Sequence, residues 1–170
     1  TSPALRVELR HCSLIGEHEE NRLMTGDRFP AALIFGVPGA GKGTQGEILT
    51  RIPGFFHCST GVIFRTMDRD SDDGRLVKEY SSRGELVPDD VTVRIWRTWI
   101  DAQRAIGGFI PRKQLLLLDG IPRTVNQCEM MEEHIDVKVV VHLVCKDIDA
   151  MIERIRRRAM LENRPDDLND

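Results

Sequence analysis

The chain carries one glycine-rich stretch, Gly36-Val37-Pro38-Gly39-Ala40-Gly41-Lys42-Gly43-Thr44-Gln45, in which four glycines lie close to a single lysine. The apolar run before it, residues 31–35, predicts a buried strand, and a helix is predicted over residues 45–50. Glycine reaches backbone conformations that turn N–H groups toward one point, and the start of the next helix adds its positive dipole end. With the charge of Lys42, this pattern predicts a loop that holds a polyphosphate rather than an ordinary tight turn.

Length and composition are those of a water-soluble protein with one core. The chain has 170 residues, of which 41% are hydrophobic, so one domain is expected. A net charge of −3 argues against a nucleic acid or an anionic membrane as the main partner. We find neither an apolar run of transmembrane length nor a signal-peptide core in the first thirty residues, so a cytoplasmic protein is expected. The four cysteines lack metal-type spacing and are interpreted as free thiols.

Strand signals alternate with helix signals along the chain. Three more apolar runs, at residues 55–58, 115–118 and 137–144, are too continuous for strands that expose one face to solvent. Such runs predict burial on both faces, and therefore an α/β fold in three layers, with a parallel sheet between helices. The domain is expected over residues 29–170, and residues 1–28 form an extension for which the sequence suggests no role.

The loop departs from the commonest phosphate-binding loop at one place. Most such loops have Ser or Thr directly after the lysine, whereas this chain has Gly43 there and Thr44 next. In this form, Gly-x-Pro-Gly-x-Gly-Lys-Gly-Thr-Gln, it resembles the loop of the adenylate kinase family of nucleoside monophosphate kinases. The resemblance implies ATP as phosphoryl donor and Mg²⁺ as cofactor. The loop residues that it implies for ATP binding are Gly39, Ala40, Gly41, Lys42, Gly43 and Thr44.

Three other segments resemble the same family. One is Asp119-Gly120-Ile121-Pro122-Arg123-Thr124-Val125-Asn126-Gln127, which differs by one apolar exchange from the family's Asp-Gly-Phe-Pro-Arg-Thr-x-x-Gln. Another is Ser59-Thr60-Gly61-Val62-Ile63-Phe64-Arg65, similar to Ser-Thr-Gly-Asp-x-x-Arg. The last is Gly84-Glu85-Leu86-Val87-Pro88-Asp89, similar to Gly-x-Leu-Val-Pro-Asp, where the backbone at the valine meets adenine. Together they imply a site for AMP under a helical clamp at about residues 58–87.

The chemistry of these side chains suits such an acceptor. Guanidinium groups match phosphate oxygens two at a time, and a carboxamide can both donate to and accept from an adenine edge. By the resemblance, Arg65 and Arg123 hold the phosphate of AMP and Gln127 contacts its base. The residues implied for AMP binding are Thr60, Gly61, Arg65, Glu85, Val87, Gly120, Arg123 and Gln127.

A magnesium partner is predicted at the end of the third apolar run. Asp119 closes the run at residues 115–118, so its carboxylate is expected at the mouth of the sheet. An aspartate at that place is by itself as often a helix cap or a turn former. The resemblance of residues 119–127 to the family favours a role in holding Mg²⁺ through water. Val62 stands where the family has a second carboxylate, which should weaken Mg²⁺ binding rather than abolish it.

A C-terminal set of arginines resembles the arginines of the family's lid. Arg154 and Arg158 are spaced four apart on a helix predicted over residues 147–158, and so project together. By the resemblance, Arg158 and Arg164 bracket a short lid at about residues 158–164. The residues implied for catalysis are Lys42, Arg123, Arg154, Arg158 and Arg164.

Three alternatives stay open beside a monomeric AMP kinase. A sensor that binds ATP and AMP without catalysis would account for Val62 and for a sequence that stops at Asp170, since the family has one more strand and another arginine beyond that point. An incomplete domain is therefore an expectation. A UMP/CMP kinase would share most of these residues. A phosphate-loop hydrolase would share Lys42 and Asp119 but has no use for the segment around Arg123.

Overall fold

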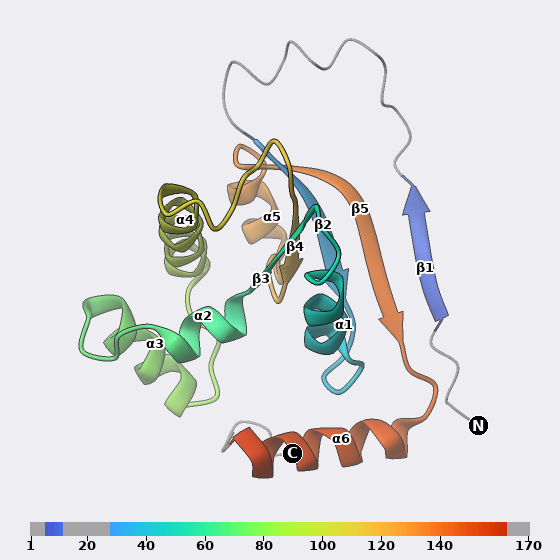
Figure 1. The fold of residues 1–170 in the computed structure, drawn as a ribbon. Coiled ribbons are helices and arrows are strands. Elements are labelled where there is room, and N and C mark those ends of the chain that lie inside the picture. Colours follow the sequence, from blue (N-terminus) through green and yellow to red (C-terminus); the bar gives the residue numbers. More distant parts are fainter. Residues whose placement is uncertain (1–5, 12–27, 163–170) are drawn as a thin grey trace.

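The computed structural model describes residues 6–11 and 28–162 as a sheet with helices packed around it (Figure 1). In chain order the helices and strands are β1 (Arg6–His11), β2 (Phe29–Phe35), α1 (Lys42–Leu49), β3 (Phe55–Ser59), α2 (Thr60–Thr66), α3 (Asp72–Ser82), α4 (Asp89–Ala105), β4 (Leu115–Asp119), α5 (Val125–Met131), β5 (Ile135–Val144) and α6 (Ile148–Glu162).

The sheet has five strands in the order β1-β5-β2-β4-β3. The neighbours β5-β2, β2-β4 and β4-β3 are parallel, which confirms the predicted α/β fold with its parallel sheet. These four strands coincide with the four apolar runs, each within two residues at either end. The helix after the glycine-rich loop begins at Lys42, three residues before the predicted start.

Both faces of the sheet are buried, as continuous apolar strands require. Along β2, Phe29, Ala31 and Leu33 pack into a core that includes Trp96 of α4 and Met131 of α5. The residues between them point the other way: Ala32 and Ile34 form a second cluster with Leu117 and Leu143, against which Leu49 of α1 packs. Helix α1 thus covers one face, and α4 and α5 cover the other (Figure 1).

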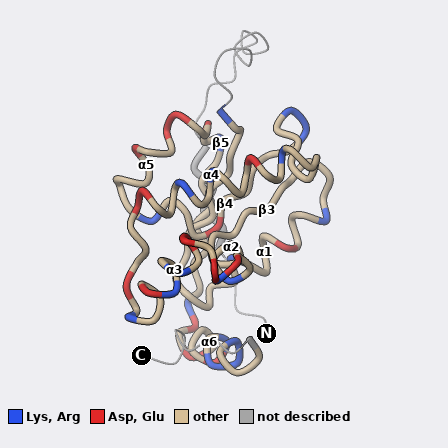
Figure 2. The backbone as a smooth tube through the Cα atoms, turned by 90° about the vertical axis from the view of Figure 1, so that its left-hand side faces the viewer, with Lys and Arg blue, Asp and Glu red and all other residues tan. Residues whose placement is uncertain are grey.

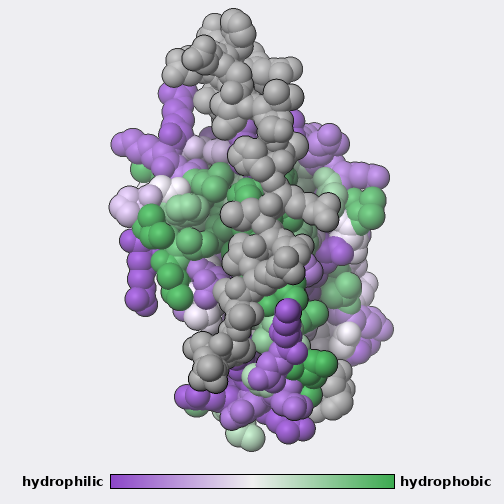
Figure 3. Space-filling view, turned by 90° about the vertical axis from the view of Figure 1, so that its right-hand side faces the viewer, coloured by the Kyte–Doolittle hydropathy of each residue, from purple (hydrophilic) through white to green (hydrophobic). Residues whose placement is uncertain are grey.

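The outer strand β1 is a feature that the sequence did not indicate. It pairs antiparallel with β5, from Arg6 opposite Val144 to His11 opposite Val139. Part of the N-terminal extension therefore belongs to the sheet, which is mixed rather than wholly parallel, a common arrangement at a sheet edge. Figure 3 views the molecule from this side and shows hydrophobic side chains among hydrophilic ones on that face.

The topology brings three of the motif segments, at residues 36–45, 59–65 and 119–127, to one edge of the sheet. The predicted phosphate-binding loop, residues 36–45 and called the P-loop below, follows the carboxyl end of β2. In the strand register Ile34 pairs with Asp119, and Asp119 pairs with Ser59. Because the strands are parallel, the segments that follow β2, β3 and β4 all leave the sheet at this edge, where α/β folds bind their ligands.

Two smaller expectations can be compared with the described residues. Cys58, Cys128 and Cys145 are free thiols, as predicted, while Cys12 lies outside the described ranges. Within residues 6–11 and 28–162, no helix is long and apolar enough to cross a membrane.

Candidate functional site

The P-loop is shaped by glycines in conformations that other residues rarely adopt. Gly39 has φ 76° and Gly41 has φ 98°, and Gly41 is the residue from which α1 starts. The loop also packs closely on α6, since a Cβ added at Gly39 would lie 2.8 Å from the carbonyl oxygen of Met151. The loop thus presents the N-terminus of α1 at the edge of the sheet, which is the arrangement that binds phosphate.

Lys42 holds the P-loop together from inside. Its Nζ donates hydrogen bonds to the carbonyl oxygens of Gly36, at 2.7 Å, and Val37, at 3.2 Å. Burial lowers the pKa of Lys42, Asp119 raises it, and the positive charges of Arg123 and Arg158 lower it. The charges of Arg123 and Arg158 therefore each act on Lys42, and these three residues are called the cation cluster below. A bound polyphosphate would offset their positive charge.

Asp119 lies between the P-loop and β3. Its residue is only 7% exposed, and a Cβ added at Gly43 would lie 3.9 Å from its Oδ2 atom. On its other side, the Nε2 atom of His57 is 3.8 Å from Oδ2. Mg²⁺ takes one or two carboxylates, keeps several waters and is bound mainly through substrate phosphates, so a single carboxylate facing a phosphate loop fits this ion.

His57 is a neighbour of the site that the sequence analysis missed. Its ring fills the space beside Gly46 of α1, where an added Cβ would come within 2.4 Å of Nε2. No hydrogen bond is made by this buried nitrogen. A histidine inside an apolar strand is usually interpreted as packing. In the register of β3 and β4 His57 is opposite Leu117, two residues before Asp119, and only the side-chain distance shows that it lies beside that carboxylate.

The residues predicted for the phosphate of AMP gather at the start of α2 and after β4. A Cβ added at Gly120 would lie 2.7 Å from the Thr60 hydroxyl and 3.3 Å from Nη2 of Arg123. A Cβ added at Gly61 would lie 3.1 Å from Nη1 of Arg65. The Nε atom of Arg123 donates to the carbonyl oxygen of Gly120 at 2.8 Å. The structure thus brings Thr60, Gly61, Gly120 and the two arginines together around the carboxyl ends of β3 and β4.

Gln127 lies at the start of α5 with both ends of its amide engaged. Its Oε1 accepts a hydrogen bond from the backbone N–H of Arg123 at 2.8 Å, and its Nε2 donates to Asp89 at 2.7 Å. Thr124 caps the same helix by accepting from the backbone N–H of Gln127 at 3.0 Å. In the sequence Asp89 is only the last residue of a motif, and its contact with Gln127 is seen only in the structure.

The remaining predicted AMP residues lie between α3 and α4. Val87 is buried, and its carbonyl oxygen accepts a hydrogen bond of 3.3 Å from the hydroxyl of Thr92. Glu85 is exposed, and its carboxylate forms an ion pair with Arg83 at 3.2 Å. The side chain of Glu85 is thus paired with an arginine of the same loop. The carbonyl oxygen of Val87 accepts from Thr92 and has a second lone pair that could accept another hydrogen bond.

The arginines of α6 lie beside the P-loop. Nη1 of Arg154 is 3.4 Å from the carbonyl oxygen of Gly39, to which it donates, and Arg158 belongs to the cation cluster. Basic positions gather on α6 below the sheet (Figure 2). The helix continues to Glu162, past residue 158 where the short lid is predicted to begin. Arg164 lies outside the described residues.

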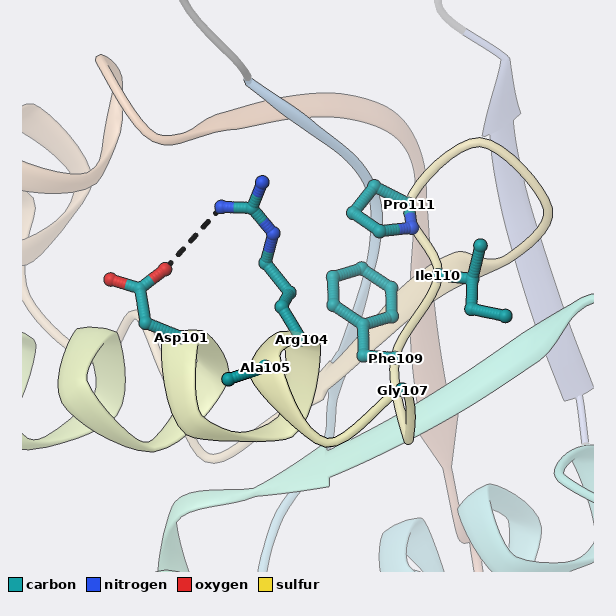
Figure 4. Close-up of a pocket in the computed structure, with 7 residues that line it drawn as sticks. All are labelled: Asp101, Arg104, Ala105, Gly107, Phe109, Ile110 and Pro111. Carbon is teal, nitrogen blue, oxygen red and sulfur yellow. Dashed lines mark hydrogen bonds and ion pairs between the residues drawn. The ribbon is translucent and has the colours of Figure 1, made fainter.

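A surface depression elsewhere does not overlap with these residues (Figure 4). It lies at the end of α4, where Arg104 pairs with Asp101 at 3.4 Å and the rings of Phe109 and Pro111 form a wall. The loop that forms it precedes β4, so it lies at the amino ends of the parallel strands, opposite the P-loop. Its chemistry is not that of a phosphate site.

Comparison with known proteins shows which family the chain matches. Residues 34–170 match the family model described as adenylate kinase. The chain is 41% identical over 136 residues to an adenylate kinase of Bacillus licheniformis, covering 77% of this chain and 59% of that protein. It is 38% identical to one from a Geobacillus species, covering 77% and 60% of the two chains, and 38% identical to one from Kocuria rhizophila, covering 81% and 72%. The chain thus spans 59% and 60% of the length of the first two relatives.

Proposed function

Because this chain belongs to the adenylate kinase family, we propose that it transfers the γ-phosphoryl group of Mg²⁺-ATP reversibly to AMP, which gives two molecules of ADP. The observation that supports this most is the cation cluster. Lys42 comes from the P-loop, Arg123 from the predicted acceptor segment and Arg158 from α6, yet the charges of both arginines act on Lys42. A donor site and an acceptor site that share their positive charges are suited to moving a phosphoryl group between them.

The proposed reaction is a direct, in-line transfer without a covalent enzyme intermediate. An oxygen of the AMP phosphate forms a bond to the γ-phosphorus as the bond to the bridging oxygen of ATP breaks, and ADP leaves. The residues act by holding donor and acceptor in line and by balancing the charge on the moving group. Lys42 and the P-loop N–H groups would hold the ATP phosphates, together with the flanking residues Gly39, Ala40, Gly41, Gly43 and Thr44.

Mg²⁺ is proposed at Asp119, through water. When bound, the ion would neutralise charge on the ATP phosphates. Asp119 would orient the waters of that ion, and the carboxylate is already held close to Gly43 of the loop.

The acceptor would lie between α2 and the segment after β4. Arg65 and Arg123 are proposed to hold the phosphate of AMP, because both guanidinium groups lie close to the glycines of this edge. Thr60, Gly61, Glu85, Val87, Gly120 and Gln127 are proposed to line the rest of the AMP site.

Closure over the bound nucleotides is proposed for the helical clamp and for the arginines of α6. Arg154, Arg158 and Arg164 would close over the transferring group and exclude water, which would otherwise hydrolyse ATP. The short lid at about residues 158–164, the monomeric state and the cytoplasmic location stay predictions from the sequence.

An acceptor assay tests the proposed function. ADP formation from Mg²⁺-ATP by the full-length protein should be fastest with AMP, slower with CMP, UMP or GMP, and close to background with ATP alone. Equal rates with all four acceptors would contradict the AMP assignment. ATP and AMP binding without any transfer would instead support the sensor, and fastest transfer to UMP or CMP would support the UMP/CMP kinase.

A second test concerns Mg²⁺ and the exposed side chain of Val62. This residue is 47% exposed in α2, so a carboxylate would be tolerated there. We expect Val62→Asp to lower the Mg²⁺ concentration for half-maximal activity about 10-fold, which is within the range of outer-shell changes to metal sites. Val62→Asn is the control, because asparagine has the shape of aspartate without its charge. An unchanged Mg²⁺ requirement in Val62→Asp would mean that this position does not face the ion.

A further inference from the structure

Three donors of the segment that starts α5 converge on one carboxylate of α4. Asp89 accepts hydrogen bonds from Oγ1 of Thr124 at 2.9 Å, from Nδ2 of Asn126 at 3.0 Å and from Nε2 of Gln127 at 2.7 Å. The hydrogen bonds from Asn126 and Thr124 lower the pKa of Asp89 most, burial opposes them, and the hydrogen bond from Gln127 lowers the pKa further. The carboxylate is therefore ionised at neutral pH, and it acts only as an acceptor.

The two partners of the Gln127 amide allow only one orientation of that amide. The Asp89 carboxylate can only accept, and the backbone N–H of Arg123 can only donate. The amide must therefore turn its NH₂ group toward Asp89 and its oxygen toward Arg123, as it does in the structure. A flipped amide would set oxygen against the carboxylate and NH₂ against the N–H, so both contacts would become repulsive.

Each end of the amide can form one more hydrogen bond, which is available to a ligand. Nε2 has a second hydrogen, and Oε1 has a second lone pair. Gln127 is only 3% exposed, so little water competes for these two groups. A base edge that meets them must offer an acceptor to the hydrogen and a donor to the oxygen in a fixed order. Adenine has an amino donor beside a ring-nitrogen acceptor, whereas a 6-oxo purine has an acceptor beside a ring N–H donor.

We propose that Asp89 is a positioning residue for base selection: it fixes the orientation of the Gln127 amide, so that the acceptor site takes 6-amino purines and rejects 6-oxo purines. This inference rests on the proposed function and adds to it a residue that touches no nucleotide. A neutral amide at position 89 could either donate or accept, so a flipped Gln127 would be opposed only by the N–H of Arg123 and no longer by residue 89 as well.

The test compares AMP with IMP, because these nucleotides differ only at the 6-substituent and the neighbouring ring nitrogen. Equilibrium binding of each to the full-length protein is measured by calorimetry, and kcat/KM is measured with each as acceptor. Asp89→Asn should lower the preference for AMP over IMP about 10-fold, the size expected when a fixed hydrogen-bond pattern is lost. The change should lie in the affinity and KM for the acceptor rather than in kcat at saturating AMP.

Two matched variants separate positioning from general damage. Asp90→Asn removes the same charge from the next residue of the first turn of α4, which is exposed, and should leave the preference unchanged. Asp89→Glu retains an acceptor-only carboxylate and should retain most of the preference. In ¹⁵N-labelled protein without nucleotide, the side-chain amide signals of Gln127 should shift or broaden in Asp89→Asn but not in Asp90→Asn.

The outcomes distinguish the inference from the function on which it rests. An unchanged preference for AMP in Asp89→Asn, or an unchanged Gln127 amide signal, would overturn the role of Asp89. A wild-type protein that binds AMP no better than IMP would overturn it as well. Absence of transfer to AMP, with the amide signals responding as expected, would instead count against the kinase reaction and leave the orientation of Gln127 supported.

Discussion

Lys42→Met lowers the rate of ADP formation from ATP and AMP by about 100-fold or more, if the P-loop lysine balances the charge of the transferring group as proposed. Methionine has a similar length and no charge, so it fills the same space without a donor. In the nucleotide-free protein the Nζ atom is bound to the carbonyl oxygens of Gly36 and Val37. Those oxygens face the edge of the sheet where water can replace the lysine, so the fold should survive.

Steady-state ADP formation and thermal unfolding measure the two parts of this prediction. Lys113→Met is the matched control, because Lys113 is exposed in the loop before β4, at the opposite edge of the sheet. The control should retain its turnover. Turnover in Lys42→Met within a few fold of the wild type would show that the phosphate charge is balanced elsewhere.

Arg123→Ala should also lower turnover by about 100-fold or more, with a higher KM for AMP and little change in the KM for ATP. The side chain is exposed apart from the hydrogen bond of its Nε to the Gly120 carbonyl oxygen, so its removal leaves no cavity. Arg123→Lys retains the charge without the planar fork, and it should recover only part of the activity.

The control for this arginine is Arg112→Ala, at an exposed position of the loop before β4. Rates are measured at saturating ATP while AMP is varied, and thermal unfolding is followed without nucleotide. A fall of several degrees in the unfolding temperature of Arg123→Ala alone would mark Arg123 as a structural residue. A raised KM for ATP rather than for AMP would place it on the donor side.

The sequence predicted those parts of the fold whose signals are local. Each parallel strand is an apolar run, and the P-loop carries its glycines at fixed spacing, so residues 31–35 and 36–45 could be interpreted without knowledge of their neighbours. Asp119 could be predicted at the mouth of the sheet for the same reason, because it ends such a run. Its closeness to Gly43 then follows from the parallel register.

The rest depends on contacts between distant segments. Asp89 and Gln127 are brought together only by the packing of α4 beside α5, so the acid at the start of α4 looked like any helix-terminal acid. His57 looks like part of an apolar strand in the sequence, and only the folded structure shows its side chain beside Asp119 of the neighbouring strand. In β1, mixed charge hid a strand that depends on β5 for all its pairing.

The pairing of β1 with β5 has a consequence for the order in which the fold can assemble. Among the strands that the structure describes, the six residues of β1 come first along the chain and their partner β5 comes last, so these two strands cannot pair until β5 has been made. Contacts this far apart in sequence form slowly, since a long loop must be closed first. Until then β5 presents an open edge over most of its length, and such an edge can join to a second chain. Within residues 6–11 and 28–162, the strand nearest the start of the chain thus covers part of the edge of the strand nearest its end.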